Sequence, residues 1–341
     1  MPEHKNIFLH KPQINISYSS TGRMWLIFFC AFLCVLQSAL SDGGVSFIPA
    51  FTALAASMIT ELLLTCKTYG MSKLKDGSAA ATAMILALML PNQIHPAYAA
   101  LGAVFAIIVV KHSFGGLGAN WLNPALGGWL FIKLSWPGVF TDALGNVTAS
   151  ITEFGGIKDI SAMDNSVTEF LNSSVFSILG VQLPLGYVDL MFHNDPGIIV
   201  DRGIFFLLAG SIIITASAIN RGWIPLVFLA VFGFLVRLAG DSSGILWNGD
   251  LLYGFFSGGT IVVAFIIAAE PASSAKLKLG VLVNIILSAV LAWFFRYRCG
   301  EYFGAFIAIA LVNCFTPLVR LLEEKFFITH KNHGKFQGNI L

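Results

Sequence analysis

Long runs of apolar residues, separated by short polar connections, cover most of the chain. A helix that spans a bilayer needs about 20 mostly apolar residues. The approximate apolar segments are 24–40, 46–66, 79–91, 97–110, 121–136, 203–219, 223–239, 253–269, 279–295 and 302–320. The shortest of them require tilted or broken helices, and a break at membrane depth must be buried in protein. The pattern therefore predicts an all-α polytopic membrane protein with about ten transmembrane helices.

The composition supports this class and excludes others. Of the 341 residues, 56% are hydrophobic and only 11% are charged, whereas a soluble domain carries about 25% charged residues. The net charge is only +2, and the chain has no basic patch of the kind that binds nucleic acid. The five cysteines show no C-x-x-C spacing, so we expect neither a disulfide framework nor a metal site.

Charged residues are divided unevenly between the two sides of the predicted bundle. With ten spans both termini lie on one side, and that side carries 14 of the 20 Lys and Arg residues. The excess of positive charge predicts that both termini are cytoplasmic. The one long connection, about 137–202, then lies on the extracytoplasmic side, and a loop of this length is usually functional.

The two apolar halves of the chain echo each other. Asp76-Gly-Ser-Ala-Ala-Ala-Thr82 opens a span in the first half, and Phe256-Ser-Gly-Gly-Thr260 opens one in the second. Because each half holds five spans, an odd number, the second repeat must be inverted relative to the first. The other interpretation is that small residues at helix starts are simply common in membrane proteins. The predicted divisions are a tail 1–23, a five-helix repeat 24–136, a loop region 137–202, a second five-helix repeat 203–320 and a tail 321–341.

A glycine-rich connection precedes the fifth predicted span. Gly115, Gly116 and Gly118 allow positive backbone φ angles or the close approach of another group. Asn123-Pro124 is typical of a helix start, with Asn as N-cap and Pro in the first turn. Such a helix start offers N–H groups to an anion or a carbonyl. A packed re-entrant turn without a ligand is the equal alternative.

Two carboxylates lie in or beside the apolar segments. Glu61 lies six residues before Lys67, which is roughly 9 Å into the membrane at 1.5 Å per helical residue. An intramembrane carboxylate is a functional candidate by default, so Glu61 is either an ion-path residue or the partner of a lysine near the surface. Glu270 ends the eighth span, directly before Pro271, and is the second ion-path candidate.

Four segments carry a resemblance to a known family. They are Lys-Asp-Gly-Ser at 75–78, the Gly-Gly-Leu-Gly and Asn-Pro-Ala motifs within 111–128, Gly-Trp-Ile-Pro at 222–225, and Ser-Gly-Gly-Thr to Glu-Pro at 257–271. The chain closely resembles the family of the D subunit of the Rnf electron-transport complex and the B subunit of the sodium-pumping NADH:quinone oxidoreductase. Its length is more similar to that of the Rnf protein.

The resemblance implies a fold, cofactors and partners. The expected fold is two inverted five-helix bundles that resemble urea transporters. The expected cofactors are FMN, attached through its phosphate to a Thr of the long external loop, and riboflavin or a second noncovalent flavin. The implied partners are the other subunits of an Rnf-type complex and membrane lipid, in a bacterial inner membrane. That complex couples electron flow between ferredoxin and NAD to Na⁺ or H⁺ movement.

The expected FMN acceptor matches the family pattern only in part. The acceptor in the family resembles Asp-x-x-Ser-x-Ala-Thr-Pro-Leu, and Thr168 with Ser166 is the nearest match here. Val167 and Glu169 replace the Ala and Pro that flank the Thr, and a neighbouring carboxylate disfavours a phosphodiester. An ordinary surface loop or a noncovalent flavin therefore remains an alternative to covalent attachment.

Three functions are compatible with the sequence. The first is a flavoprotein subunit that transfers electrons and is not catalytic alone, since the chain has no catalytic residue set, no ferredoxin-type cysteine run and no dinucleotide-binding fingerprint. The second is a small-solute channel or transporter with a urea-transporter-like fold, which inverted repeats and broken helices would suit. The third is a flavin-free structural subunit of the same complex.

Overall fold

A computed structural model gives the architecture of the chain. The structure describes residues 20–66, 74–116, 118–141, 173, 197–217, 221–240, 246–247, 249–275 and 277–337. These residues are almost entirely helical and include no β-strand beyond an isolated bridge between Pro91 and Ile198. Ser166 and Thr168, the expected FMN-binding residues, lie outside the described residues.

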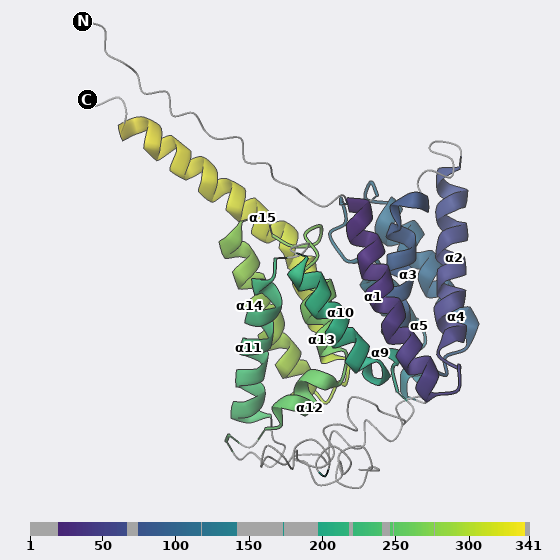
Figure 1. Ribbon diagram of the computed structural model, residues 1–341. Coiled ribbons are helices and arrows are strands. Elements are labelled where there is room, and N and C mark those ends of the chain that lie inside the picture. Colours follow the sequence, from purple (N-terminus) through teal and green to yellow (C-terminus); the bar gives the residue numbers. More distant parts are fainter. Residues whose placement is uncertain are drawn as a thin grey trace, which may run out of the picture.

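The helices follow the predicted apolar segments closely. The first group comprises α1 (Ser20–Ser41), α2 (Phe47–Thr65), α3 (Ser78–Leu88), α4 (Pro96–Phe105) with its π-helical continuation η2 (Ala106–His112), and α5 (Pro124–Ser135). The second group comprises α9 (Ile199–Arg202), α10 (Ile204–Ala216), α11 (Trp223–Ala239), α12 (Leu251–Phe256), α13 (Thr260–Val262) with its π-helical continuation η5 (Val263–Ile267), α14 (Lys278–Tyr297) and α15 (Gly304–Gln337). Figure 1 shows the two groups side by side, with α1 next to α9 and α10.

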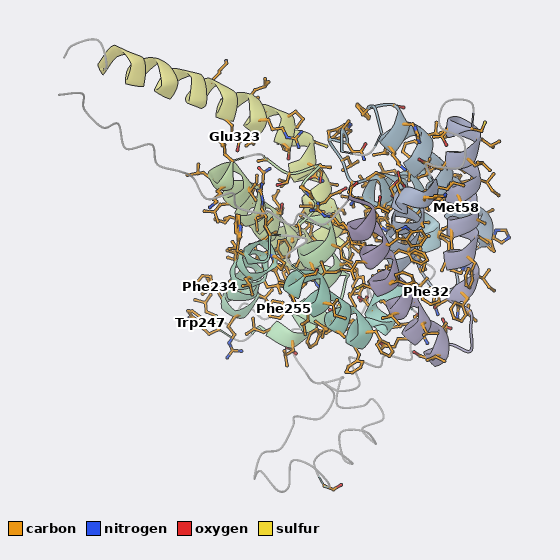
Figure 2. The ribbon with its side chains drawn as sticks, turned by 45° about the horizontal axis from the view of Figure 1, so that its top comes forward. Phe32, Met58, Phe234, Trp247, Phe255 and Glu323 are labelled. Atoms are coloured by element: carbon orange, nitrogen blue, oxygen red, sulfur yellow. The ribbon has the colours of Figure 1, made fainter. Side chains whose placement is uncertain are left out.

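Several helices are long and apolar enough to cross a membrane. Among the described residues, four helical segments reach that length, namely Ser20–Ser41, Phe47–Thr65, Lys278–Tyr297 and Gly304–Glu323. Four shorter apolar helices accompany them. Apolar side chains also point outward around both groups (Figure 2), for example Phe234, which is 55% exposed. The prediction of an all-helical polytopic membrane protein is confirmed at this level, while the number of ten spans and their inverted repeat stay predictions.

Two spans differ from their predicted limits for local reasons. The segment 253–269 is interrupted at Ser257–Gly259, because Gly258 and Gly259 both have positive φ angles (64° and 70°) that a continuous helix cannot contain. Helix α15 continues to Gln337, well beyond the predicted end of the last span. In Figure 1 this extension projects away from the rest of the bundle. Near its base, Glu323 accepts a hydrogen bond from the backbone N–H of Leu277, just before α14.

The bundle has two ends, which we name from Figure 1. The upper face is the end where α1 begins, and the lower face is the end where α1 finishes and where α9 and α12 lie. Small residues bring α1 and the second group into contact. The Sγ of Cys30 lies 3.6 Å from the carbonyl oxygen of Gly210, and Cys34 is buried against Gly203. Both thiols therefore act as packing groups.

Helix α5 also joins the two groups, along its whole length. Near its end, Lys133 Nζ lies 2.9 Å from Glu301 Oε1. In its middle, the ring of Trp129 packs edge-on against Phe303 and Phe306 with centroids 5.5 and 5.2 Å apart. All three rings are fully buried. This aromatic contact fills the space between the groups below the upper face.

The contact between α1 and the second group yields a stability prediction. A Cβ added at Gly203 would lie 2.4 Å from the carbonyl oxygen of Cys34, whereas a Cβ at Gly138 would meet nothing within 4 Å. We expect Gly203→Ala to lower the free energy of unfolding by about 1–3 kcal/mol, as overpacking usually does. Gly138→Ala is the matched control and should be neutral or slightly stabilising. Thermal unfolding of the two purified variants tests this, and equal stability would contradict it.

Candidate functional site

A cavity of about 280 Å³ lies between the two helix groups at the upper face. This volume is near the lower end of the roughly 300–1,000 Å³ that small-molecule sites occupy. Its walls come from the start of α1, from α3, from the end of η2, from the start of α5 and from the segment after η5. Because these elements end or begin at the upper face, the cavity collects the polar residues of five helix termini.

The cavity brings together three of the residues singled out from the sequence. Gly118, Asn123 and Glu270 all line it. Gly115 and Gly116 lie in the turn before Gly118, and all three have the positive φ angles expected of them (104°, 90° and 93°). The N–H of Gly116 donates to the carbonyl of Lys111 at 3.0 Å, which closes this turn over the end of η2. Sequence residues 123 and 270, 147 positions apart, thus meet at one site.

Asn123 is the N-cap of α5, as its position before Pro124 predicts. Its Oδ1 accepts hydrogen bonds from the N–H groups of Ala125 (2.9 Å) and Leu126 (3.2 Å). Its Nδ2 donates to Glu270 Oε2 at 2.7 Å. The side chain of Asn123 therefore satisfies these two N–H groups, which are not left to bind an anion. What Asn123 contributes to the cavity is the anchoring of a carboxylate.

Glu61 lies behind the cavity wall in a buried ionic cluster. Its Oε2 is 2.9 Å from Lys111 Nζ and 3.0 Å from His112 Nε2. Lys111 Nζ also donates to Ser78 Oγ at 2.7 Å. The side chains of Glu61 and Lys111 are only 2% and 3% exposed. Pairing with a lysine was one of the two sequence interpretations, but the partner comes from η2 inside the bundle, 50 residues away, and not from the surface.

Arg23 is a cavity residue that the sequence analysis missed as a site. It lines the cavity from the start of α1, and its Nε is buried without a hydrogen-bond partner among the described residues. The ion pairs found in the described part of the chain do not join Arg23 to Glu270, although both line the same cavity. The position of Arg23 at the boundary between the tail and the first span could have indicated a site. A basic residue there is also explained by the excess of Lys and Arg that flanks membrane spans on the cytoplasmic side.

Asn120 is the second lining residue that sequence reasoning did not identify. It is 2% exposed, and in the amide orientation that satisfies its neighbours it donates to the carbonyls of Gly116 (3.1 Å) and Lys111 (3.3 Å). Asn120 thus fixes the glycine turn at the cavity edge. Both π-helical segments also end near the site, η2 just after Lys111 and η5 three residues before Glu270, and such segments are frequent at functional sites.

The cavity has a defined chemical character. Met24, Ile27, Ala81, Ile85 and Ile266 give it apolar walls. An arginine, Arg23, and a carboxyl group, Glu270, lie among its polar lining residues, and none of the ion pairs in the described ranges joins them. A mostly apolar ligand that carries both hydrogen-bond donors and acceptors would suit both sets of lining residues. The described residues contain no cluster of three or more His, Cys, Asp or Glu side chains that could hold a metal.

The Glu61–Lys111 pair yields a second prediction. Lys111→Met leaves a buried carboxylate short of its main partner, and such a change destabilises a protein by about 3–5 kcal/mol. The matched control is Lys133→Met, because the Lys133–Glu301 pair is more exposed (18% and 33%) and should contribute at most about 1 kcal/mol. Adding Glu61→Gln to Lys111→Met should restore part of the loss. Unfolding free energies of the purified variants measure these differences, and equal losses for the two lysines would contradict the prediction.

The chain is similar to known proteins over nearly its whole length. The model of the NQR2, RnfD, RnfE family matches residues 7–327. The chain is 26% identical over 319 residues to the D subunit of the proton-translocating ferredoxin:NAD(+) oxidoreductase complex of Clostridium ljungdahlii, covering 92% of this chain and 94% of the relative. It is 31% identical over 280 residues to the D subunit of the ion-translocating oxidoreductase complex of Aeromonas hydrophila, covering 74% and 77%. The chain therefore belongs to the NQR2, RnfD, RnfE family.

Proposed function

We propose that this chain is the D-type membrane subunit of an Rnf-type ion-translocating oxidoreductase complex. The observation that carries the proposal is the family match over residues 7–327, together with relatives that bear this name and are covered nearly end to end. The protein would act with the other subunits of the complex, because its sequence holds neither a ferredoxin-type cysteine run nor a dinucleotide fingerprint. Electrons must then enter and leave through partners.

We infer a ten-helix arrangement of two inverted repeats for this protein. One supporting feature is that α3 and α13 both start after a glycine with a left-handed conformation, Gly77 (φ 72°) and Gly259 (φ 70°). A second is that a buried basic residue is bonded next to each start, Lys111 at Ser78 and Arg296 at Ser257. The long loop 137–202 would be extracytoplasmic and both termini cytoplasmic, in a bacterial inner membrane.

The cavity at the upper face is the proposed site of a noncovalent flavin, riboflavin or a related molecule. The residues present fit such a group. The apolar walls suit the fused rings, and the imide edge of a flavin offers the acceptors and the donor that Arg23 and Glu270 can satisfy. Asn123 would hold Glu270 in place through its 2.7 Å hydrogen bond. When bound, a flavin supplies the ability to accept and pass on one or two electrons.

A second flavin, FMN on Thr168, remains part of the proposal for the loop region. Ser166 precedes the acceptor as in the family pattern, whereas Val167 and Glu169 depart from it. For ion movement, Glu61 and Glu270 are the candidate residues. Glu270 is the better placed of the two, because it lines the cavity, whereas the cavity lining does not include Glu61, whose carboxylate contacts Lys111 and His112.

The buried aromatic contact argues against the alternative of a solute channel. Trp129, Phe303 and Phe306 are each fully buried and pack against one another between the two helix groups. An aqueous path that ran between the two helix groups would have to pass these rings. The cavity is also compatible with the flavin-free structural subunit. The visible absorbance of the purified protein distinguishes that alternative from a flavoprotein.

The flavin proposal predicts a specific loss on mutation. The purified wild-type chain should show the visible absorbance of oxidised flavin, and acid precipitation should release the noncovalent fraction. Arg23→Met should weaken this binding by about ten- to a hundredfold, as expected for a lost hydrogen bond from a charged group. Arg221→Met is the control, because Arg221 is an exposed residue before α11. A wild-type protein without flavin absorbance would overturn the noncovalent site and favour the structural subunit.

The proposed covalent attachment of FMN to Thr168 leads to a separate prediction. After denaturing electrophoresis, the wild-type band should fluoresce under ultraviolet light when the host supplies the flavin-attaching enzyme, and Thr168→Ala should abolish the fluorescence. Ser173→Ala, in the same region of the chain, is the matched control and should leave the band fluorescent. A dark wild-type band would contradict covalent attachment at Thr168.

A further inference from the structure

A second buried polar cluster lies at the lower face, far from the cavity, around Asp201. Asp201 belongs to α9, outside the membrane-spanning helices, yet it is only 6% exposed. Its carboxylate accepts hydrogen bonds from the N–H groups of Gly258 (3.3 Å) and Gly259 (3.2 Å). The hydroxyl of Tyr302 donates a third, to Oδ2. The carboxylate therefore holds the break between α12 and α13.

No residue larger than glycine fits at either position of the break. Both have left-handed φ angles, so their N–H groups turn toward the same carboxylate. A Cβ on Gly258 would lie 2.6 Å from the carbonyl oxygen of Tyr302, and one on Gly259 would lie 2.2 Å from the ring of Phe306. Only glycines can therefore bring both N–H groups of the break against the carboxylate of Asp201.

The nearby arginine does not pair with this carboxylate. Arg296 is 1% exposed and donates to the carbonyls of Gly254 (3.2 Å) and Ser257 (2.8 Å), as well as to the hydroxyl of Thr260. None of the ion pairs in the described ranges joins Arg296 to Asp201. The hydrogen bonds that the structure gives Asp201 thus come from neutral donors, in contrast to those of Glu61.

Burial and hydrogen bonding act in opposite directions on Asp201. Burial raises the pKa of Asp201 to about 6, although the hydrogen bonds from Tyr302 and Gly259 and the charge of Arg296 oppose this rise. The other titratable or charged groups around it are Cys34 of α1, Tyr253 of α12 and the adjacent Arg202. Near neutral pH the buried carboxyl is therefore within reach of protonation.

We propose that Asp201 is a proton-binding site at the lower face, and that its occupancy decides whether the N–H groups of Gly258 and Gly259 at the break are held. A carboxylate accepts on both oxygens, whereas a protonated carboxyl carries an O–H donor on one of them. A proton on Oδ1 would face the N–H of Gly259, so that bond would be lost. The site takes a proton as its ligand and does not depend on what binds in the cavity.

The direction of the coupling follows from linkage. The N–H bonds from the break favour the ionised form of Asp201, so a state that lacks them, with the carboxyl still buried, has the higher pKa. Proton uptake therefore shifts the population toward the released break, and a held break reciprocally disfavours proton uptake. Below the pKa the break should be more dynamic than above it.

The test uses the full chain in lipid nanodiscs, from about pH 5 to about pH 8. Infrared spectra should show a protonated-carboxyl band that grows as pH falls with a midpoint near 6, as the pKa of Asp201 implies. In parallel, hydrogen exchange at Gly258 and Gly259, normalised for the intrinsic pH dependence, should show protection that falls over the same range. Asp201→Asn should remove the component of the band that titrates near pH 6 and leave low protection that does not change with pH.

Two further variants separate a proton site from a merely structural carboxylate. Tyr302→Phe removes one donor to the charged form but keeps the carboxyl, so both midpoints should move up by about one pH unit or more. Asp250→Asn is the matched control, because Asp250 also accepts backbone N–H bonds near the lower face, from Leu252 and Tyr253. It should leave the titration unchanged. A band of unchanged amplitude in Asp201→Asn, a wild-type protein without a transition, or an unmoved midpoint in Tyr302→Phe would overturn the proposal.

Discussion

Buried charge at the starts of α3 and α13 is the constraint on which the rest of the structure depends. The two helices begin at opposite faces, and the polar residues at their starts, Ser78 and Ser257, are buried from water. At the start of α3, Lys111 reaches Ser78 at 2.7 Å and is neutralised by Glu61. At the start of α13, Arg296 binds the carbonyl of Ser257 at 2.8 Å. Each basic side chain comes from a different helix than the one it holds, so these contacts fix how the helices are arranged.

The cavity is a consequence of how the two groups meet. Helix α5 touches the second group through Lys133 at its lower end, through Trp129 in its middle and through Asn123 at its upper end. The aromatic contact fills the middle, whereas at the upper face the groups separate enough to leave about 280 Å³. Polar helix ends line this space because helices begin and end there. A site between two helix groups is where a ligand can couple to the relative position of both.

The two faces hold carboxylates in different electrical settings. At the upper face Glu61 contacts two basic side chains, so groups that can carry the opposite charge lie directly against it. At the lower face Asp201 accepts hydrogen bonds from two backbone N–H groups and a tyrosine. In a low-dielectric interior an ionised group needs close compensation, and hydrogen bonds from neutral donors compensate less than opposite charges do.

The sequence by itself determined the features that depend on neighbouring residues. Apolar runs of sufficient length predicted a helical membrane protein, Asn123-Pro124 predicted a capped helix start, and Gly115, Gly116 and Gly118 predicted left-handed turns. Local backbone geometry and hydropathy decide these outcomes, so a single sequence carries them. Distant contacts were decided only by the tertiary structure. Glu61 and Lys111 are 50 residues apart, and Asp201 and Tyr302 are 101 apart. Helical periodicity shows which face of a helix is apolar, but not which helix packs against that face, and therefore not which polar groups become partners.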